Sequence, residues 1–217
     1  MAQYFIRQID KYLNEWKDDR YRKPLLIRGA RQIGKSSAAR NFGKTFKYFV
    51  EINLEREQDL KELFGKNIDV KKICSRLSVL KQIPIVPGET LLFIDEIQES
   101  ERAIASLRYF YEDYPELHVV AAGSLLEFAL RELSSFGVGR ITSVYMYPFS
   151  FDEFLRATGQ GMLADYKMNE ASCTNPLPQS FHDNLVDSLR AYYLIGGMPE
   201  AVRYWQETHD MLHVSRI

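Results

Sequence analysis

Short apolar runs alternate with amphipathic stretches over the first two thirds of the chain. Apolar runs bounded by turn-forming residues are typical of strands buried in a parallel sheet, and apolar residues that recur every three to four positions are typical of helices. The expected strands are residues 23–28, 46–54, 90–95, 117–122 and 140–147. The expected helices are residues 3–18, before the first strand, and residues 36–42, 56–64, 69–82 and 99–113, between strands. This alternation predicts an α/β fold with a five-stranded, mainly parallel sheet flanked by helices.

The pattern changes after Pro148, beyond which only helical periodicity is found. The expected elements there are helices at about 150–158, 180–195 and 198–212 and a loop at 171–178. A change from alternating strands and helices to helices alone indicates a second folding unit. We therefore predict a core domain at residues 1–148 and a small all-helical lid subdomain at residues 149–217.

The segment that joins the first strand to the next helix matches the phosphate-loop (Walker A) pattern G-x-x-x-x-G-K-[ST] at every fixed position. Its residues are Gly29, Ala30, Arg31, Gln32, Ile33, Gly34, Lys35 and Ser36, followed by Ser37. Glycines let such a loop curl so that several N–H groups face one point, and the helix amino end adds positive charge there. We expect this segment to bind ATP, with Lys35 at the β- and γ-phosphates and the Ser36 hydroxyl on Mg²⁺.

A second motif of the Walker B type follows four apolar residues at 91–94 and consists of Asp95 and Glu96. The carboxyl edge of a parallel sheet is where ligands bind in open α/β folds. Asp95 is expected to hold the Mg²⁺ shell, and Glu96 to orient and deprotonate the water that attacks the γ-phosphate. An acidic turn after a strand is by itself weak evidence for a nucleotide site. The phosphate loop upstream strengthens this interpretation.

Two further polar residues could act on the γ-phosphate. Ser124 ends the strand at 117–122 and could hydrogen-bond the attacking water, or it could cap a helix at 125–131, or do both. Arg140 follows Gly139 and could offset γ-phosphate charge, in cis or from a neighbouring subunit, or it could be a surface residue that begins a strand.

Several segments have the sequence pattern of one family: the phosphate loop, Ile-Asp-Glu-Ile-Gln at 94–98, Ala-Gly-Ser at 122–124, Gly-Arg at 139–140, Tyr-Pro-Phe-Ser-Phe-Asp-Glu-Phe at 147–154 and Gly-Gly-Met-Pro-Glu-Ala-Val at 196–202. Together these segments resemble the prokaryotic AAA-type ATPases of the archaeal-ATPase group. The resemblance implies an AAA-type ATPase usually followed by a carboxy-terminal domain of unknown function, so the chain is short for the family and could be truncated. It also implies that a Gly-x-Pro turn ending at Pro199 contacts adenine, although a plain helix-breaking turn is the alternative. Assembly into a homo-oligomer and an unidentified protein or DNA partner follow from the resemblance too.

Composition narrows the class of protein. The 217 residues are 46% hydrophobic, and a net charge of -1 argues against a chain that mainly coats nucleic acid or an acidic membrane. No apolar run approaches the roughly 20 residues that span a bilayer, and the first residues lack a signal-peptide pattern. Cys74 and Cys173 are far apart in sequence, so reduced thiols and a cytoplasmic location are expected.

These observations predict Mg²⁺-dependent binding and hydrolysis of ATP, used as a conformational switch. ATP is favoured over GTP because the guanine-reading pattern Asn-Lys-x-Asp is absent from the sequence. A nucleotide-binding regulator with little turnover and a small-molecule kinase of the same fold are the alternatives. Glu96 argues against the kinase, which rarely needs a hydrolytic base.

Overall fold

The computed structural model describes residues 4–65, 67–124, 139–172 and 174–210. Its contacts divide the chain into two compact units. One unit is Ile9–Met146, and the other contains residues 4–8 together with the described residues from 147 to 210.

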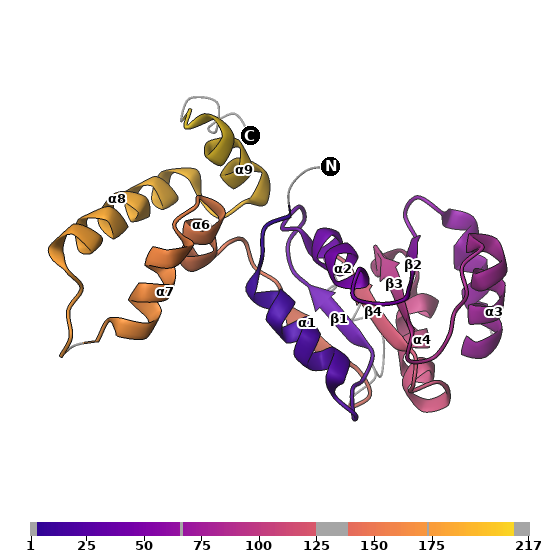
Figure 1. Ribbon diagram of the computed structural model, residues 1–217. Helices are drawn as coiled ribbons and strands as arrows, with labels where there is room; N and C mark the ends of the chain where they lie inside the picture. The colour runs from indigo at the N-terminus through magenta and orange to yellow at the C-terminus, as the bar shows by residue number, and fades with distance from the viewer. Residues whose placement is uncertain (1–3, 66, 125–138, 173, 211–217) are drawn as a thin grey trace. The chain divides into compact units, whose positions relative to one another are not determined.

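The first unit is built on one five-stranded sheet with the order β2-β3-β4-β1-β5 (Figure 1). Its strands are β1 (Leu25–Arg28), β2 (Tyr48–Asn53), β3 (Thr90–Asp95), β4 (His118–Ala122) and β5 (Thr142–Tyr145). Every paired strand runs parallel to its neighbour. All five carboxyl ends therefore lie at one edge of the sheet, which confirms the predicted α/β fold.

Helices cover the sheet between successive strands. They are α1 (Gln8–Asp18), α2 (Lys35–Gly43), α3 (Val70–Lys81), α4 (Glu101–Asp113) and the short 3₁₀ helices η1 (Gln58–Phe64) and η2 (Ile97–Glu99). Local caps fix where α3 and α4 begin, since Asp69 accepts a hydrogen bond from the Lys72 N–H at 3.0 Å and Ser100 accepts one from the Ala103 N–H at 3.2 Å. The helix expected at 56–64 is present as the 3₁₀ helix η1.

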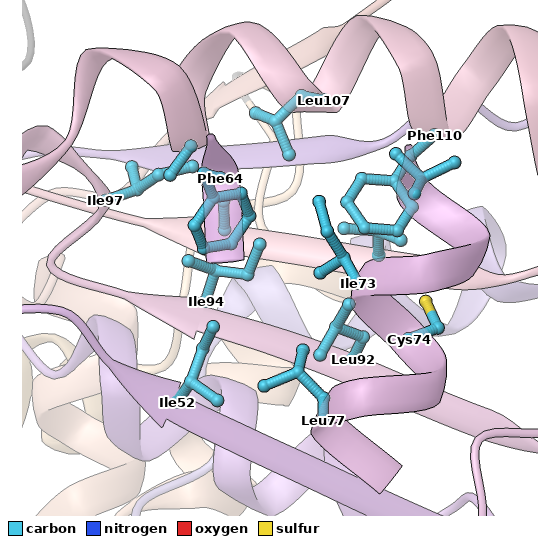
Figure 2. Packing of buried hydrophobic residues seen from close by; sticks show 14 of the residues in the cluster. Ile52, Phe64, Ile73, Cys74, Leu77, Leu92, Ile94, Ile97, Leu107 and Phe110 are labelled. Atoms are coloured by element: carbon cyan, nitrogen blue, oxygen red, sulfur yellow. The ribbon is translucent and has the colours of Figure 1, made fainter. Parts of the chain in front are cut away.

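One face of the sheet packs against η1, α3 and α4 in a continuous apolar core (Figure 2). Ile52 and Ile94 project from adjacent strands toward Phe64 and Leu77, and all four side chains are fully buried. Each such side chain contributes roughly 1.5–3 kcal/mol on burial. Every residue of β3 is buried, so this strand is covered on both faces and carries Asp95 rigidly at its end.

The second unit is helical. Its described helices are α6 (Phe151–Ala157), α7 (Gly161–Glu170), α8 (Gln179–Ile195) and α9 (Pro199–Thr208). The sequence pattern missed α7 because this helix has no apolar stripe: Ala164 is its one buried residue, while Met162 and Met168 are exposed. The last expected helix, at 198–212, ends at Thr208, and residues 211–217 lie outside the described residues.

The amino-terminal residues belong to the helical unit, which the sequence-based division at residue 148 did not anticipate. Ser150 and Glu153 form a capping box at the start of α6. The guanidinium of Arg7 lies 3.0 Å from the Glu153 carboxylate, and both side chains are less than 10% exposed. The Gln8 N–H donates to the same carboxylate at 2.8 Å. A buried charge is stable when it is paired in this way, so residues 4–8 are held in the unit by Glu153.

Candidate nucleotide-binding site

The phosphate loop connects β1 to α2 and has the backbone that its glycines permit. Gly29 and Gly34 have positive φ angles of 136° and 94°. A Cβ atom at Gly29 would lie 2.2 Å from the carbonyl oxygen of Met146, so no other residue fits there. Gln32 is also left-handed, with a φ of 63°, which is an uncommon conformation for a residue with a side chain.

The Lys35 ammonium is folded back into this loop. It donates hydrogen bonds to the carbonyl oxygens of Gly29 at 3.0 Å and Ala30 at 2.6 Å. Burial lowers the pKa of Lys35, the nearby Glu96 and Asp95 carboxylates oppose this effect, and Arg31 adds to it. The ammonium is therefore largely shielded from water and is held by the carbonyl oxygens of the loop.

Asp95 lies at the end of β3 and is buried. Its carboxylate accepts hydrogen bonds from Ser36 and from the N–H of Glu96. Burial, more than the neighbouring carboxylates, raises the pKa of Asp95. The structure thus brings together the two residues predicted to serve Mg²⁺.

The chemistry of these donors fits that ion. Mg²⁺ usually keeps several waters and takes one or two protein oxygens together with substrate phosphates. Among the described residues there is no group of three or more His, Cys, Asp or Glu side chains that could hold a metal by themselves. Ser36 and Asp95 would suit a Mg²⁺ ion that arrives with a nucleotide.

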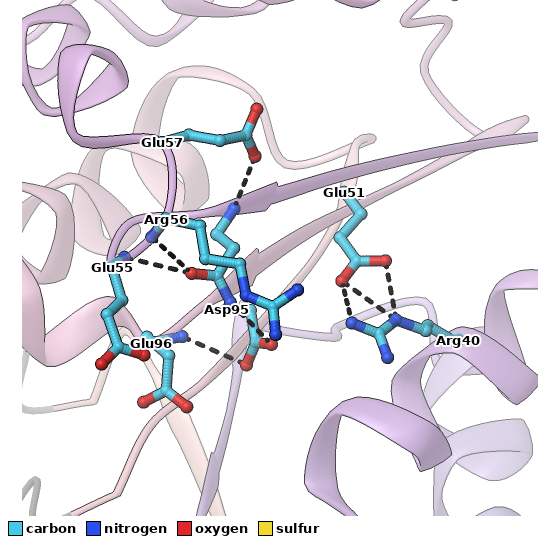
Figure 3. Close-up of polar contacts among 8 residues, drawn as sticks. Arg40, Glu51, Glu55, Arg56, Glu57, Asp95 and Glu96 are labelled. Carbon is cyan, nitrogen blue, oxygen red and sulfur yellow. Dashed lines mark hydrogen bonds and ion pairs between the residues drawn. The ribbon is translucent and has the colours of Figure 1, made fainter.

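Asn53 orients Asp95 and was not identified from the sequence. Its side-chain N–H donates to Asp95 at 3.3 Å, and its side-chain oxygen accepts from the backbone N–H groups of Glu55 at 3.1 Å and Arg56 at 2.9 Å. Figure 3 labels these three partners. Asn53 ends β2 in register with Asp95 on β3. A polar residue that ends the neighbouring strand was the available signal, but the strand order was needed to use it.

Glu96 follows Asp95 and is also left-handed, with a φ of 50°. Its carboxylate accepts a hydrogen bond of 2.7 Å from the side-chain amide of Gln98. The other end of this amide, the Gln98 Oε1 atom, is buried and has no hydrogen-bond partner among the described residues. Strained backbone and an incompletely satisfied polar group are features that cluster at functional sites.

These groups surround one pocket with a volume of about 370 Å³. Its lining residues are Arg31, Gln32, Gly34, Lys35, Ser36, Ser37, Glu55, Glu96 and Ser124. The pocket thus contains most of the predicted phosphate loop together with the predicted base. Glu55 is a lining carboxylate that the sequence analysis did not select.

Ser124 lies at the same pocket, one strand away from Asp95. It is 2% exposed, and its hydroxyl accepts a hydrogen bond of 3.4 Å from the Nε–H of Arg31. The alternative role of Ser124 as a helix cap concerns residues 125–131, which lie outside the described residues.

Arg140 is not brought to the pocket. It precedes β5, whose residue Thr142 pairs with Leu25 at the start of β1, whereas the phosphate loop follows the other end of β1. Arg140 forms an ion pair with Glu112 at 2.5 Å. The in-cis geometry considered for Arg140 is therefore wrong within this unit, and a role in a neighbouring subunit stays a prediction.

Pro199 is the first residue of α9 in the helical unit. Gly196 precedes it with a positive φ of 77°, so the Gly-Gly-Met-Pro segment forms a tight turn before the helix. The assignment of Pro199 to adenine stays a prediction.

The comparisons with known proteins agree with this site. A family model described as the AAA domain matches residues 21–155. The chain belongs to this family. The match covers the phosphate loop, Asp95 and Glu96 as well as Ser124, and it confirms the predicted resemblance to AAA-type P-loop ATPases, which bind ATP. The carboxy-terminal domain that often follows in relatives is not confirmed.

Solved structures give further evidence for the AAA fold. The Walker-type ATPase PABY2304 of Pyrococcus abyssi is similar with a TM-score of 0.57 and 20% identity, over 98% of this chain and 71% of that one. PCH-2 of C. elegans gives a TM-score of 0.49 with 12% identity over 94% of this chain and 63% of that one. The ORC1 protein of Aeropyrum pernix in complex with DNA gives 0.44 with 14% identity over 94% and 63%. The last two similarities are too low to carry an argument.

A search among curated proteins finds no match to the sequence. Within the described part of this AAA ATPase, no helix has both the length and the apolar character needed to cross a membrane.

Proposed function

We propose that the protein binds ATP with Mg²⁺, hydrolyses it, and uses the reaction as a conformational switch. The observation that carries this proposal is the arrangement at the carboxyl edge of the sheet. The Ser36 hydroxyl meets the Asp95 carboxylate, and Lys35 and Glu96 line the same pocket. This combination supports hydrolysis as well as binding. Asp95 contacts the predicted metal ligand Ser36, and Glu96 is a second carboxylate that could serve as the base.

Binding begins with an exchange at Lys35. In the structure its ammonium donates to two carbonyl oxygens of the loop. Phosphate oxygens are better partners for an ammonium than neutral carbonyls, because the attraction between opposite charges adds to the hydrogen bond. Ser36 and Asp95 would hold Mg²⁺, which when bound neutralises charge on the β- and γ-phosphate oxygens.

Glu96 is proposed as the residue that orients the attacking water and accepts its proton. Gln98 occupies one oxygen of this carboxylate, so the second oxygen is left for the water. Ser124, across the pocket, is proposed to hydrogen-bond the γ-phosphate or the water.

The switch itself and its partner are further parts of the proposal. Loss of the γ-phosphate removes the acceptor for Lys35 and Ser124, so the groups around the pocket adopt different contacts before and after hydrolysis. We expect the partner to be a protein or DNA, the protein to be cytoplasmic, and a homo-oligomer to be possible by analogy with AAA-type assemblies. Arg140 is then a candidate for contact with the nucleotide of a neighbouring subunit, and Pro199 for contact with adenine.

A turnover assay separates this proposal from its alternatives. Purified protein should release phosphate from ATP with Mg²⁺ and without any added acceptor, and release should stop when Mg²⁺ is chelated. A regulator with little turnover would bind ATP with the same affinity but release almost no phosphate. A small-molecule kinase would release phosphate to water slowly and consume ATP only when an acceptor is added.

A further inference from the structure

The side chain of the loop residue Arg31 contacts a residue of another strand end, Ser124. It is the third residue of the loop, lines the pocket, and directs its Nε–H across the pocket to Ser124 at the end of β4. The contact is long, at 3.4 Å, and therefore weak for a hydrogen bond. A guanidinium has five N–H donors, so the planar end of Arg31 keeps donors available for an anion.

The charges around the pocket support an anion at this position. Arg31 and Lys35 are the two cations among the residues that line the pocket. They are close enough for Arg31 to disfavour the charged form of Lys35. No carboxylate is paired with Arg31 in the described part of the chain, whereas Arg40, Arg108 and Arg156 each have one. The lining carboxylates Glu55 and Glu96 equal these cations in number, but neither is paired with Arg31, so its guanidinium can be stabilised by a multivalent anion such as a triphosphate.

We propose that Arg31 contacts the γ-phosphate of ATP from within the same chain and acts as a catalytic residue for its hydrolysis. This inference rests on the proposed function and deepens it. Lys35 lies deeper in the loop and serves the β- and γ-phosphates. Arg31 instead reaches from the loop toward Ser124. The terminal phosphate would meet the predicted water on this Ser124 side of the pocket. On nucleotide binding, the guanidinium exchanges the Ser124 hydroxyl for two γ-phosphate oxygens in a bidentate contact.

The step that Arg31 assists balances as an ordinary hydrolysis. The oxygen of a water attacks the γ-phosphorus, and the bond from that phosphorus to the β–γ bridging oxygen breaks. The bridging oxygen leaves with its electron pair on ADP, and the proton of the water goes to Glu96. Arg31 lowers the barrier by offsetting charge on the γ-phosphoryl oxygens and the bridging oxygen.

An arginine supplied from the same loop makes a neighbouring subunit unnecessary for hydrolysis. This distinguishes the role of Arg31 from that of Arg140, which lies at the opposite edge of the sheet and could act only in trans. Specific activity should therefore be independent of protein concentration. Arg140→Ala should retain most of the turnover if Arg31 supplies the cation.

The test compares Arg31→Ala and Arg31→Lys with wild type and with Arg102→Ala, an exposed arginine of α4 that serves as the control. Three quantities are measured: phosphate release at several protein concentrations, affinity for ADP and for a non-hydrolysable ATP analogue by calorimetry, and retention of ADP with fluoroaluminate, which mimics the transferring phosphoryl group.

For Arg31→Ala we expect turnover to fall at least about 100-fold, ADP affinity to stay within about threefold, and the fluoroaluminate complex to be lost. Arg31→Lys should restore part of the turnover, and the control should match wild type.

Several results would overturn this role for Arg31. Unchanged turnover and unchanged fluoroaluminate retention in Arg31→Ala would exclude it. Equal losses of ADP and ATP-analogue affinity would show that Arg31 only shapes the loop. Activity restored by mixing Arg31→Ala with Glu96→Gln would show action in trans. If wild type releases no phosphate, the proposed hydrolysis fails. The calorimetric affinities then still decide whether Arg31 recognises the γ-phosphate, because Arg31→Ala must lose the preference for the ATP analogue over ADP.

Discussion

Phe149 and Gly197 are joined backbone to backbone across the helical unit. The N–H of Phe149 donates to the carbonyl oxygen of Gly197 at 2.7 Å, and a Cβ atom at Gly197 would lie 2.4 Å from the carbonyl oxygen of Phe149. The Tyr192 hydroxyl donates to the same Phe149 oxygen at 2.6 Å. Two of the sequence segments that resemble the family, at 147–154 and 196–202, are therefore joined by one structural contact.

Gly197→Ala should destabilise the helical unit. The added methyl group would force the backbone of Phe149 to move and would weaken two hydrogen bonds, at a cost of roughly 1–3 kcal/mol or more. Thermal unfolding followed by the fluorescence of Trp205, which packs in this unit, should show a lower midpoint. Gly161→Ala is the matched control, because a Cβ atom there would lie 3.9 Å from the nearest atom. A midpoint for Gly197→Ala equal to that of the control would contradict the importance of the contact.

Lys35→Ala should weaken ATP binding at least tenfold, which corresponds to about 1.4 kcal/mol. The ammonium is the buried cation of the loop, and its removal leaves the phosphates without a charge-assisted donor at that point. Calorimetric titration with ATP and Mg²⁺ measures the effect. Lys44→Ala, an exposed lysine after the end of α2, should bind like wild type. Equal affinities for all three proteins would remove the basis of the phosphate-loop assignment.

Glu96→Gln should separate binding from hydrolysis. The amide has the size of the carboxylate but cannot accept the proton, so turnover should fall roughly 10²-fold or more while ATP affinity stays nearly constant. Steady-state phosphate release and calorimetry give the two quantities. Glu101→Gln replaces an exposed carboxylate of α4 and should leave both unchanged. Wild-type turnover in Glu96→Gln would assign the base to another residue, and Glu55 would be the next to test.

Gln98→Leu should lower kcat by roughly tenfold and leave KM for ATP almost unchanged. Gln98 donates to Glu96 at 2.7 Å, and a hydrogen bond to a charged group contributes about 1.5–3 kcal/mol to its placement. If kcat stays as in wild type, Gln98 does not position Glu96.

Stability should decline on acidification because of His118. This side chain is buried beside Trp16 and Phe46, and burial, with a smaller effect of Arg22, lowers its pKa to about 4. The native state therefore binds fewer protons than the unfolded state, in which the imidazole has a pKa of about 6.5. The free energy of unfolding should fall as pH drops from about 6.5 toward about 4, by on the order of 2–3 kcal/mol at most.

Urea unfolding at pH 7 and pH 5 provides the measurement. His118→Leu should be less sensitive to this change of pH than wild type, and His182→Gln, at an exposed position on α8, should show the wild-type sensitivity. Equal losses of stability in His118→Leu and wild type would place the acid sensitivity elsewhere.

Motifs with fixed spacing could be predicted from the sequence. The phosphate loop and the pair Asp95 and Glu96 each follow an apolar run that can only be a buried strand, and the parallel sheet then places both at one edge. The extent of β3 was predicted to the residue because every position of this strand is buried. The roles of these residues, like those of Ser124, Arg140 and Pro199, stay predictions.

Features that depend on strand order or on polar packing could not be predicted in the same way. The position of Asn53 beside Asp95 requires that β2 and β3 be neighbours in register. Arg140 was assigned by its place after Ser124 in the sequence, whereas the direction of β5 sets it at the other edge of the sheet. The attachment of Arg7 to Glu153 joins residues 146 positions apart, and no local pattern indicates such a pair.

The pairing of Arg7 with Glu153 also holds residues that precede the sheet in the helical unit. The helical unit contains residues on both sides of Ile9–Met146, so the nucleotide-binding sheet is inserted within it and tethered by two connections. A protease cut in one connection would leave the units covalently linked through the other. Removal of residues 4–8 would leave the Glu153 carboxylate, 8% exposed, without its guanidinium.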